Sequence, residues 1–347
     1  MLLFFDAFSH LLVDALCAAT IFGPVHDAEA FLYLILLYNT LAFSTQCFVG
    51  LAADRIRRHD LAAPLSLLVT ALGCVLPLPP LWRIVVIGCG NSVFHVAGGA
   101  RTLENSGGRA GPLGVFVAPG AVGLALGTLF PGWGIGFAVL AAVTALLLVI
   151  VSRRTAARAP DESGIPAGRS VPVKTPLLSV ILLTLAVAVR AVGGSVVSFP
   201  WKTGAVTALL LTFAVWAGKT AGGFVCDRLG PSKSALLSVP AAALLIAFCA
   251  PWMIPSLAGQ FALNLTMPIT LWLLYRAMPD SPGFAFGLAA SALWPGTIAG
   301  LLIPLTGSAA TALTLASFLF GLGAILYASK TIRQGEELLL PEKENAA

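Results

Sequence analysis

The chain has 347 residues, of which 58% are hydrophobic and only 10% are charged, and its formal net charge is +5. Soluble domains carry roughly 25% charged residues. Together with a mean hydropathy of +0.93, this composition excludes a water-soluble globule.

Taken in chain order, the apolar stretches are each close to the ~20 residues that a helix needs to cross a hydrocarbon core. The first six cover approximately residues 2–23, 28–53, 60–80, 82–103, 110–131 and 133–152. A segment rich in Pro, Gly, Ser and charges follows, and this composition indicates a linker. The second six cover approximately residues 176–199, 204–227, 233–252, 255–277, 282–304 and 307–329. The sequence thus predicts an all-α membrane protein with twelve transmembrane helices in two pseudo-symmetric six-helix bundles, at 1–152 and 176–347, joined by a cytoplasmic linker at 153–175.

The basic residues predict the orientation in the lipid bilayer. When the spans are threaded alternately, 16 of the 20 Lys and Arg fall on the side of the N-terminus and two on the other side. Cytoplasmic loops carry such an excess, so both termini are expected in the cytoplasm. This topology explains the net positive charge, and we expect no nucleic-acid partner.

Three further expectations follow from residue usage. The first span continues directly into a multispan chain without a basic start, so we expect no cleaved signal. The six cysteines all lie in spans without metal-like spacing, which predicts reduced thiols, no metal site and no cofactor. Abundant Ala and Gly, with Arg outnumbering Lys, indicate a bacterium of high GC content and hence its plasma (inner) membrane.

The two halves of the chain repeat each other. "GLAADRIRRHD" begins at Gly50 and "GFVCDRLGPSK" at Gly223, and each reads G-x-x-x-D-R at the inner end of the second span of its half. A common offset of 173 residues relates Asp54 to Asp227, Gln46 to Lys219, and Asn91 to Asn264. Duplicated halves of this kind are a plan on which transporter folds are built.

The pattern G-x-x-x-D-R-x-G resembles the loop signature of the major facilitator superfamily. The second copy fits it through Gly230, whereas the first has Arg57 at that position. The resemblance implies close helix approach at the glycines and a charged latch that closes the inner gate. The expected latch residues are Gly50, Asp54, Arg55, Gly223, Asp227 and Arg228. The alternative is that each Asp-Arg pair only marks the end of a span.

Several polar side chains lie inside the predicted spans, where charges are costly and usually face a cavity or a partner. In the superfamily that the repeat resembles, spans 1, 4, 7 and 10 line a central cavity, and most of these residues fall on those spans. The expected substrate and proton pathway consists of His10, Asp14, Asn91, His95, Arg190, Gln260 and Asn264, with Lys219 on span 8.

Most of these residues also have a purely structural interpretation. Asp14 and Arg190 could form a static ion pair between the halves, and His95 could be a core histidine bonded to a backbone carbonyl. The amide side chains could join helices by hydrogen bonds, and Lys219 could extend to the inner surface. Asp6 lies near the inner interface and is expected to be solvated.

Two further stretches narrow the resemblance. "SHLLVD", from Ser9 to Asp14, and "GNSVFHVAGGARTLENSGGRAG", from Gly90 to Gly111, resemble the fosmidomycin-resistance branch of the superfamily. That branch has Pro and Glu just after the histidine of the fourth span, where this chain has Val96 and Ala97. One candidate proton site of the branch is therefore absent, and its drug specificity transfers poorly.

The sequence predicts a secondary transporter that works by alternating access and exports a small organic solute or drug in exchange for protons. Asp14 would be the proton-linked carboxylate, Arg190 its charge partner or an anchor for an anionic substrate, and His10 and His95 a proton relay. The alternatives are an importer or facilitator of a small organic anion, a lipid flippase, and a non-transporting receptor or scaffold. No nucleotide-binding motif or nucleophile–base cluster is present, so we expect no enzyme. We expect a monomer.

Overall fold

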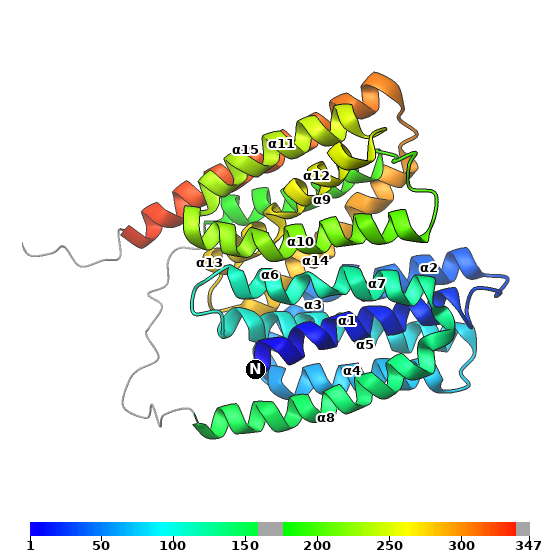
Figure 1. Ribbon diagram of the computed structural model, residues 1–347. Helices are drawn as coiled ribbons and strands as arrows, with labels where there is room; N and C mark the ends of the chain where they lie inside the picture. Colours follow the sequence, from blue (N-terminus) through cyan, green and yellow to red (C-terminus); the bar gives the residue numbers. More distant parts are fainter. Residues whose placement is uncertain (159–175, 338–347) are drawn as a thin grey trace, which may run out of the picture.

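The computed structural model describes residues 1–158 and 176–337, which are all-helical (Figure 1). Within these residues, eleven helical segments are long and apolar enough to cross a membrane, and the helix at His59–Val75 is a shorter apolar one. The predicted fold class, an all-α membrane protein, is confirmed. Residues 159–175 of the predicted linker and the tail after residue 337 lie outside the described residues.

The helices of the first half correspond to the six predicted spans, and two of these spans consist of more than one helix. In chain order its helices are α1 (Leu2–Phe22), α2 (Phe31–Asn39), η1 (Thr40–Ser44), α3 (Gln46–Ile56), α4 (His59–Val75), α5 (Pro80–Glu104), α6 (Gly111–Val117), α7 (Pro119–Leu129), η2 (Pro131–Trp133) and α8 (Gly134–Arg158). The segment α2–η1–α3 forms one span, and α6–α7 another. Helix α8 continues to Arg158, past the predicted end of its span at residue 152.

The second half also corresponds to six predicted spans, but its helices are interrupted at a different span. Its helices are α9 (Leu177–Ser195), α10 (Ala205–Leu229), α11 (Pro231–Cys249), α12 (Met253–Asn264), α13 (Thr266–Ala277), α14 (Pro282–Leu302) and α15 (Gly307–Glu337). Helices α12 and α13 together form one span. Helix α15 is longer than predicted and runs beyond residue 329.

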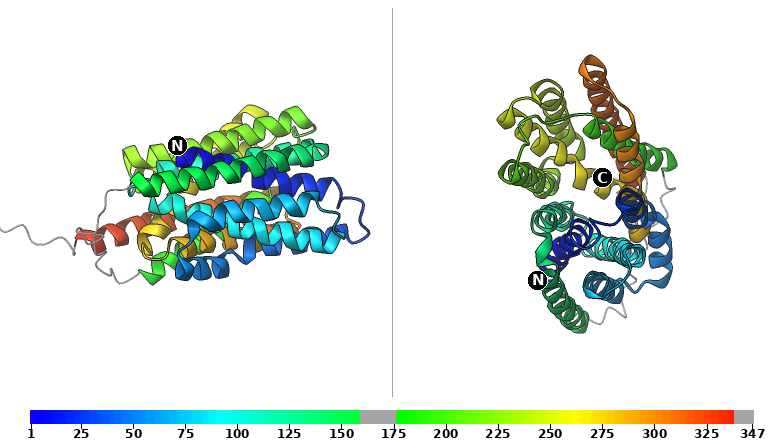
Figure 2. Two further views of the ribbon diagram at one scale, coloured as in Figure 1. Left: turned by 90° about the horizontal axis from the view of Figure 1, so that it is seen from below. Right: turned by 90° about the vertical axis from the view of Figure 1, so that its right-hand side faces the viewer.

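The two halves form two bundles that lie side by side (Figure 1; Figure 2). One buried apolar cluster is built mainly from α1, α4, α5, α6 and α8, and a second mainly from α9, α11, α12, α13 and α15. Helix α14 packs on α3 across the interface, and α10 packs on α6 and α7. The interface therefore joins the second and fifth spans of opposite halves.

Glycines allow the backbones to touch across this interface. A Cβ atom added to Gly50 of α3 would lie 2.3 Å from the carbonyl oxygen of Gly283. A Cβ added to Gly223 of α10 would lie 2.4 Å from the carbonyl oxygen of Ala110. No residue larger than glycine fits at either position without separating the bundles.

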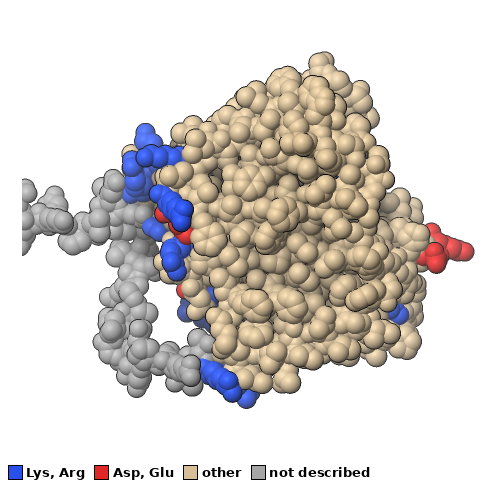
Figure 3. Space-filling view, in the orientation of Figure 1, with Lys and Arg blue, Asp and Glu red and all other residues tan. Residues whose placement is uncertain are grey.

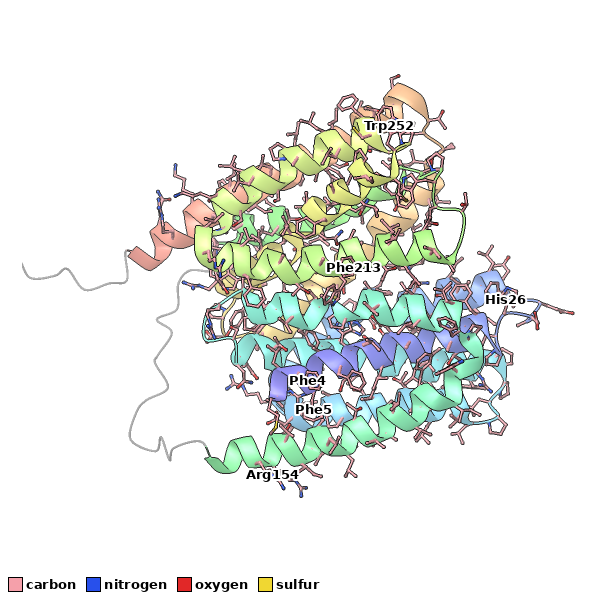
Figure 4. All side chains as sticks on the ribbon, in the orientation of Figure 1. Phe4, Phe5, His26, Arg154, Phe213 and Trp252 are labelled. Atoms are coloured by element: carbon pink, nitrogen blue, oxygen red, sulfur yellow. The ribbon has the colours of Figure 1, made fainter. Side chains whose placement is uncertain are left out.

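The surface divides into a broad uncharged belt and two polar ends. Lys and Arg gather at one end, with a few acidic side chains among them, and a further acidic group projects from the other end (Figure 3). We call the first the basic end; it includes Arg55, Arg57, Arg58, Arg109 and Arg228, which lie at the ends of α3, α6 and α10. Figure 4 shows Arg154 at this end, and Trp252 and His26 at the opposite end. Large exposed apolar side chains such as Phe213 cover the belt between them, as expected of a lipid-facing surface.

Near the basic end, the structure overturns the expectation that Asp6 is solvated. Asp6 is 1% exposed and forms an ion pair with Arg101 from the last turn of α5. The guanidinium of Arg101 also donates a hydrogen bond to the Ser152 hydroxyl at 3.2 Å and lies 3.6 Å from Asp60. The prediction of a solvated Asp6 was wrong because α5 packs beside α1 and places the guanidinium of Arg101 against this carboxylate.

Removing one partner of a buried ion pair leaves an uncompensated charge and typically costs about 3–5 kcal/mol. We therefore expect Asp6→Asn to lower the free energy of unfolding by about 3 kcal/mol. The measurement is the melting temperature of the purified protein in detergent. Asp60→Asn is the control because the Asp60 side chain is 64% exposed and contacts the same guanidinium. A loss equal to that of Asp6→Asn in this control would contradict the prediction.

Candidate functional site

A cavity of about 350 Å³ lies between the two bundles. Its walls come from α1, α5, α6 and α7 with η1 and α3 on one side, and from α9, α10, α13 and α14 on the other. Five of the eight residues predicted for the pathway line it, namely His10, Asp14, His95, Arg190 and Lys219.

A cluster of two imidazoles and one carboxylate forms the wall contributed by the first bundle. The Nε2 atoms of His10 and His95 lie 3.5 and 3.6 Å from the two carboxylate oxygens of Asp14. The Nδ1 atom of His10 is 2.7 Å from the carbonyl oxygen of Phe116, and that of His95 is 2.9 Å from the carbonyl oxygen of Asn91. Because a carbonyl oxygen can only accept a hydrogen bond, each Nδ1 carries a hydrogen and acts as the donor. Both Nε2 atoms therefore face the carboxylate.

Helical spacing positions this cluster. His10 and Asp14 lie one turn apart on α1, and Asn91 and His95 lie one turn apart on α5, so each pair shares a helix face. The amide of Asn91 donates a hydrogen bond to Asp14 at 3.1 Å. Pro119, which lacks a backbone N–H, separates α6 from α7. It lies next to the turn that contains Phe116, whose carbonyl accepts the hydrogen bond from His10.

The other wall of the cavity carries two cations. Arg190 of α9 donates a hydrogen bond to the hydroxyl of Thr266 at 3.0 Å, where α12 gives way to α13. The ammonium of Lys219 on α10 lies 3.5 Å from the carbonyl oxygen of Val117. Within residues 1–158 and 176–337, neither cation forms an ion pair, and in particular Asp14 and Arg190 do not pair with each other. Both Arg190 and Lys219 line the cavity, so they are available to bind an anion there.

The three amide residues predicted for the pathway do not line the cavity. Asn91 is fully buried behind Asp14, and Asn264 donates a hydrogen bond to the carbonyl of Gln260 within α12. The two residues of α12 do not contribute to the cavity wall.

Sequence reasoning omitted Gln46 and Gly120, which do line the cavity. Both carry a sequence signal. Gln46 is related to Lys219 by the offset of the internal repeat, and Gly120 belongs to a Pro-Gly pair that recurs at Pro295 in the fifth span of the second half.

Asp54, from the first copy of the repeat, lies at the basic end against the opposite bundle. Its two carboxylate oxygens accept hydrogen bonds from the backbone amides of Gly283 at 2.7 Å and Phe284 at 2.8 Å, in the first turn of α14. Backbone amides at a helix N-terminus are unpaired within the helix and carry partial positive charge. Asp54 therefore ties the first bundle to the second.

Asp227 makes the symmetry-related contact. It accepts hydrogen bonds from the backbone amides of Ala110 at 2.7 Å and Gly111 at 2.9 Å, where α6 begins. The neighbouring Arg55 and Arg228 are exposed. The contacts of the predicted latch residues therefore run from each carboxylate to a helix N-terminus of the other bundle.

No family model matches the sequence, and no curated protein matches it either. Solved structures do. A bacterial homologue of the iron transporter ferroportin, in an outward-facing state, has a TM-score of 0.61 and 10% identity, over 97% of this chain and 100% of that one. The major facilitator superfamily transporter FucP, in the outward conformation, has a TM-score of 0.57 and 13% identity, over 94% and 98%. A variant of the E. coli fucose:proton symporter FucP has a TM-score of 0.61 and 11% identity, over 95% and 97%.

These similarities cover almost the whole chain. The protein therefore has the fold of major facilitator superfamily transporters, as the internal repeat predicted. At identities of 10–13% the likeness defines the fold alone.

Proposed function

We propose that the protein is a secondary transporter that works by alternating access and exports a small organic solute in exchange for protons. The observation that carries this proposal is the position of Asp14, a carboxylate in contact with two imidazoles on the wall of a cavity that both bundles line. Charged groups at such depth in a membrane protein mark substrate and ion pathways.

Asp14 is suited to share a proton because the two imidazoles that face it are, like the carboxylate itself, potential proton acceptors. When both imidazoles are neutral, two Nε2 lone pairs face the carboxylate and no hydrogen lies between them. One proton bound by the cluster relieves this repulsion. The charged groups that face the cluster from the other wall are Arg190 and Lys219.

The contacts at the basic end favour a state in which the cavity is closed there and accessible from the opposite end. Asp54 and Asp227 both join the bundles at that end. If the basic end is cytoplasmic, as the positive-inside rule indicates, this state faces outward. We infer that the protein is a monomer in a bacterial inner membrane.

The class of solute rests on two features. The motifs at Ser9–Asp14 and Gly90–Gly111 resemble those of the fosmidomycin-resistance branch, which favours export of a small organic solute or drug without indicating which one. Arg190 and Lys219 favour a solute with an anionic group, such as a carboxylate or phosphonate, which guanidinium and ammonium groups bind well. Uptake of a small organic anion through the same cavity is the second candidate function, and the same two cations support it.

Both directions are tested in an efflux-deficient bacterium that expresses the wild type or Asp14→Asn at matched levels. Cells are exposed to a panel of toxic small molecules that includes fosmidomycin and other organic anions. We expect the wild type to raise the tolerated concentration of at least one compound, and Asp14→Asn not to do so. Sensitisation by the wild type would instead establish uptake. A panel on which the two strains and an empty vector behave alike contradicts drug export.

A further inference from the structure

We propose that His10, Asp14 and His95 bind a divalent first-row transition-metal ion on the wall of the central cavity. Binding itself is independent of the transport function proposed above, whereas a role for the ion as cargo rests on that function.

The donor atoms have the separation of metal ligands. One ligand atom from each of the three residues can be chosen so that all lie within 4.8 Å of one another. The two Nε2–carboxylate distances of 3.5 and 3.6 Å exceed the 2.7–3.2 Å of an ordinary N–H···O hydrogen bond. Ligands held about 2.1 Å from a tetrahedral ion lie about 3.4 Å apart. The cluster is therefore spaced to share a cation rather than to bond directly.

The groups behind the ligands fix them in the form that binds metal. A histidine that ligates a metal usually donates its other ring N–H to a carbonyl or carboxylate. Here Phe116 and Asn91 supply a carbonyl to each ring, which leaves both Nε2 lone pairs directed at Asp14. The amide of Asn91 orients the carboxylate by a further hydrogen bond.

Gly120 keeps the space at the ligands free. A Cβ atom added there would lie 2.4 Å from a carboxylate oxygen of Asp14 and 2.5 Å from Nε2 of His10. Any side chain at this position of α7 would thus compete with an ion for the same two ligand atoms.

The coordination is incomplete on the cavity side. Three protein ligands with open positions are typical of sites that exchange their fourth ligand, whereas structural sites are closed by four. All three residues line the cavity, so water or the anionic group of a solute can complete the shell. Two imidazoles and one carboxylate favour Zn²⁺, Fe²⁺, Co²⁺ or Ni²⁺ over Mg²⁺ and Ca²⁺.

Cysteine spacing alone predicted no metal site, since no cysteine takes part in this one. The ligands of the proposed site come from two helices, and Asp14 and His95 are 81 residues apart in the sequence. Among the described residues this is the one group of three or more His, Cys, Asp or Glu side chains that could hold a metal ion.

The test is a titration of the purified, tag-free protein in detergent with Co²⁺, followed by visible absorption, and with Zn²⁺, followed by calorimetry. We expect one equivalent to bind, with ligand-field bands of a four- or five-coordinate Co²⁺ that excess Mg²⁺ does not remove. His10→Gln and His95→Gln are each expected to weaken binding at least ~100-fold, since even outer-shell partners are worth 10–100-fold. The matched control is His26→Gln, because His26 is exposed near the opposite end, and it should bind like the wild type.

Gly120→Ala is the sharper variant, since it retains every ligand and fills the space that the ion needs. It is expected to lose binding while its melting temperature and elution from a sizing column show a folded protein. X-ray absorption of the Zn²⁺-loaded wild type needs no variant, and it should show imidazole ligands. Wild type that binds no Co²⁺ or Zn²⁺, a zinc shell without imidazole, or binding that His10→Gln and His95→Gln leave intact would each overturn the proposal. If the protein transports a solute but binds no metal, the metal site is overturned and the proposed function stands. If it binds the metal but transports no solute, only the proposed function is contradicted.

Discussion

Asp14→Asn is expected to abolish solute movement driven by a pH gradient in proteoliposomes, reducing accumulation to that of empty vesicles. Asparagine has nearly the shape of aspartate and retains an oxygen that can accept the hydrogen bond from Asn91, but it cannot take up and release the proton. The cavity and its two cations are unchanged, so solute binding should survive. We therefore expect exchange of labelled for unlabelled solute, at equal pH on both sides, to be retained.

The measurement pairs these two assays on one preparation, with a solute that the protection panel identifies. Asp27→Asn is the matched control, because the Asp27 side chain is 99% exposed and lies in the loop between α1 and α2. It should accumulate solute like the wild type. If Asp14→Asn accumulates solute under a pH gradient as the wild type does, Asp14 is not the coupling group. If both accumulation and exchange disappear, Asp14 serves solute binding instead.

The fold was predictable because the bilayer imposes a length and a composition on every span. Apolar stretches of about 20 residues are visible without any knowledge of tertiary contacts, and the repeat around Asp54 and Asp227 indicated two matching halves. The helix ends were less predictable. Helices α8 and α15 continue past the apolar stretch into polar residues, because hydropathy marks where a span leaves the hydrocarbon and not where its helix ends.

The site was predictable only in part. Helical spacing brought His10 and Asp14 together, since both lie on one face of one helix. The partners across helices were not visible: Asp6 meets Arg101 across 95 residues, and Asp14 meets His95 rather than Arg190. Membership in a cavity-lining span also does not fix which face a residue occupies.

The contacts of the predicted latch show a different limit. The partners of Asp54 and Asp227 are backbone amides of Gly283, Phe284, Ala110 and Gly111. Every residue other than proline has such an amide, so no side-chain pattern identifies the partner. Only the start of a helix, placed against the carboxylate by the fold, makes these amides special.

Replacing both carboxylates, Asp54→Asn with Asp227→Asn, is expected to open the basic end. Each carboxylate accepts two hydrogen bonds from a helix N-terminus, whereas an asparagine keeps one acceptor oxygen and presents an NH₂ group that cannot bond to an N–H. A hydrogen bond to a charged group contributes about 1.5–3 kcal/mol and a neutral one about 0.5–1.5 kcal/mol. We therefore expect a loss of about 1–2 kcal/mol at each site. Together the two losses shift the equilibrium between the states closed and open at the basic end by roughly 30- to 1,000-fold.

The shift is measured as the labelling rate of Cys47 by a maleimide, resolved by peptide mass spectrometry. Cys47 lies on α3 where that helix meets α14, and its amide bonds to the Ser291 hydroxyl at 2.9 Å, so separation of the bundles exposes it. Cys249, the last residue of α11, lies at the other end of the second bundle from Asp227 and serves as the internal reference. Its rate should not change, and each single variant should give an intermediate rate for Cys47.

The matched control neutralises the neighbouring cations instead, by Arg55→Gln with Arg228→Gln. Because both arginines are exposed and the described contacts run from the carboxylates to backbone amides, we expect these variants to label Cys47 at close to the wild-type rate. Equal effects from the arginine and aspartate variants would show that an Asp–Arg pair closes the gate, as the sequence motif alone suggested. An unchanged rate in the double aspartate variant would mean that glycine-mediated packing, at Gly50 and Gly223, is sufficient to hold the basic end closed.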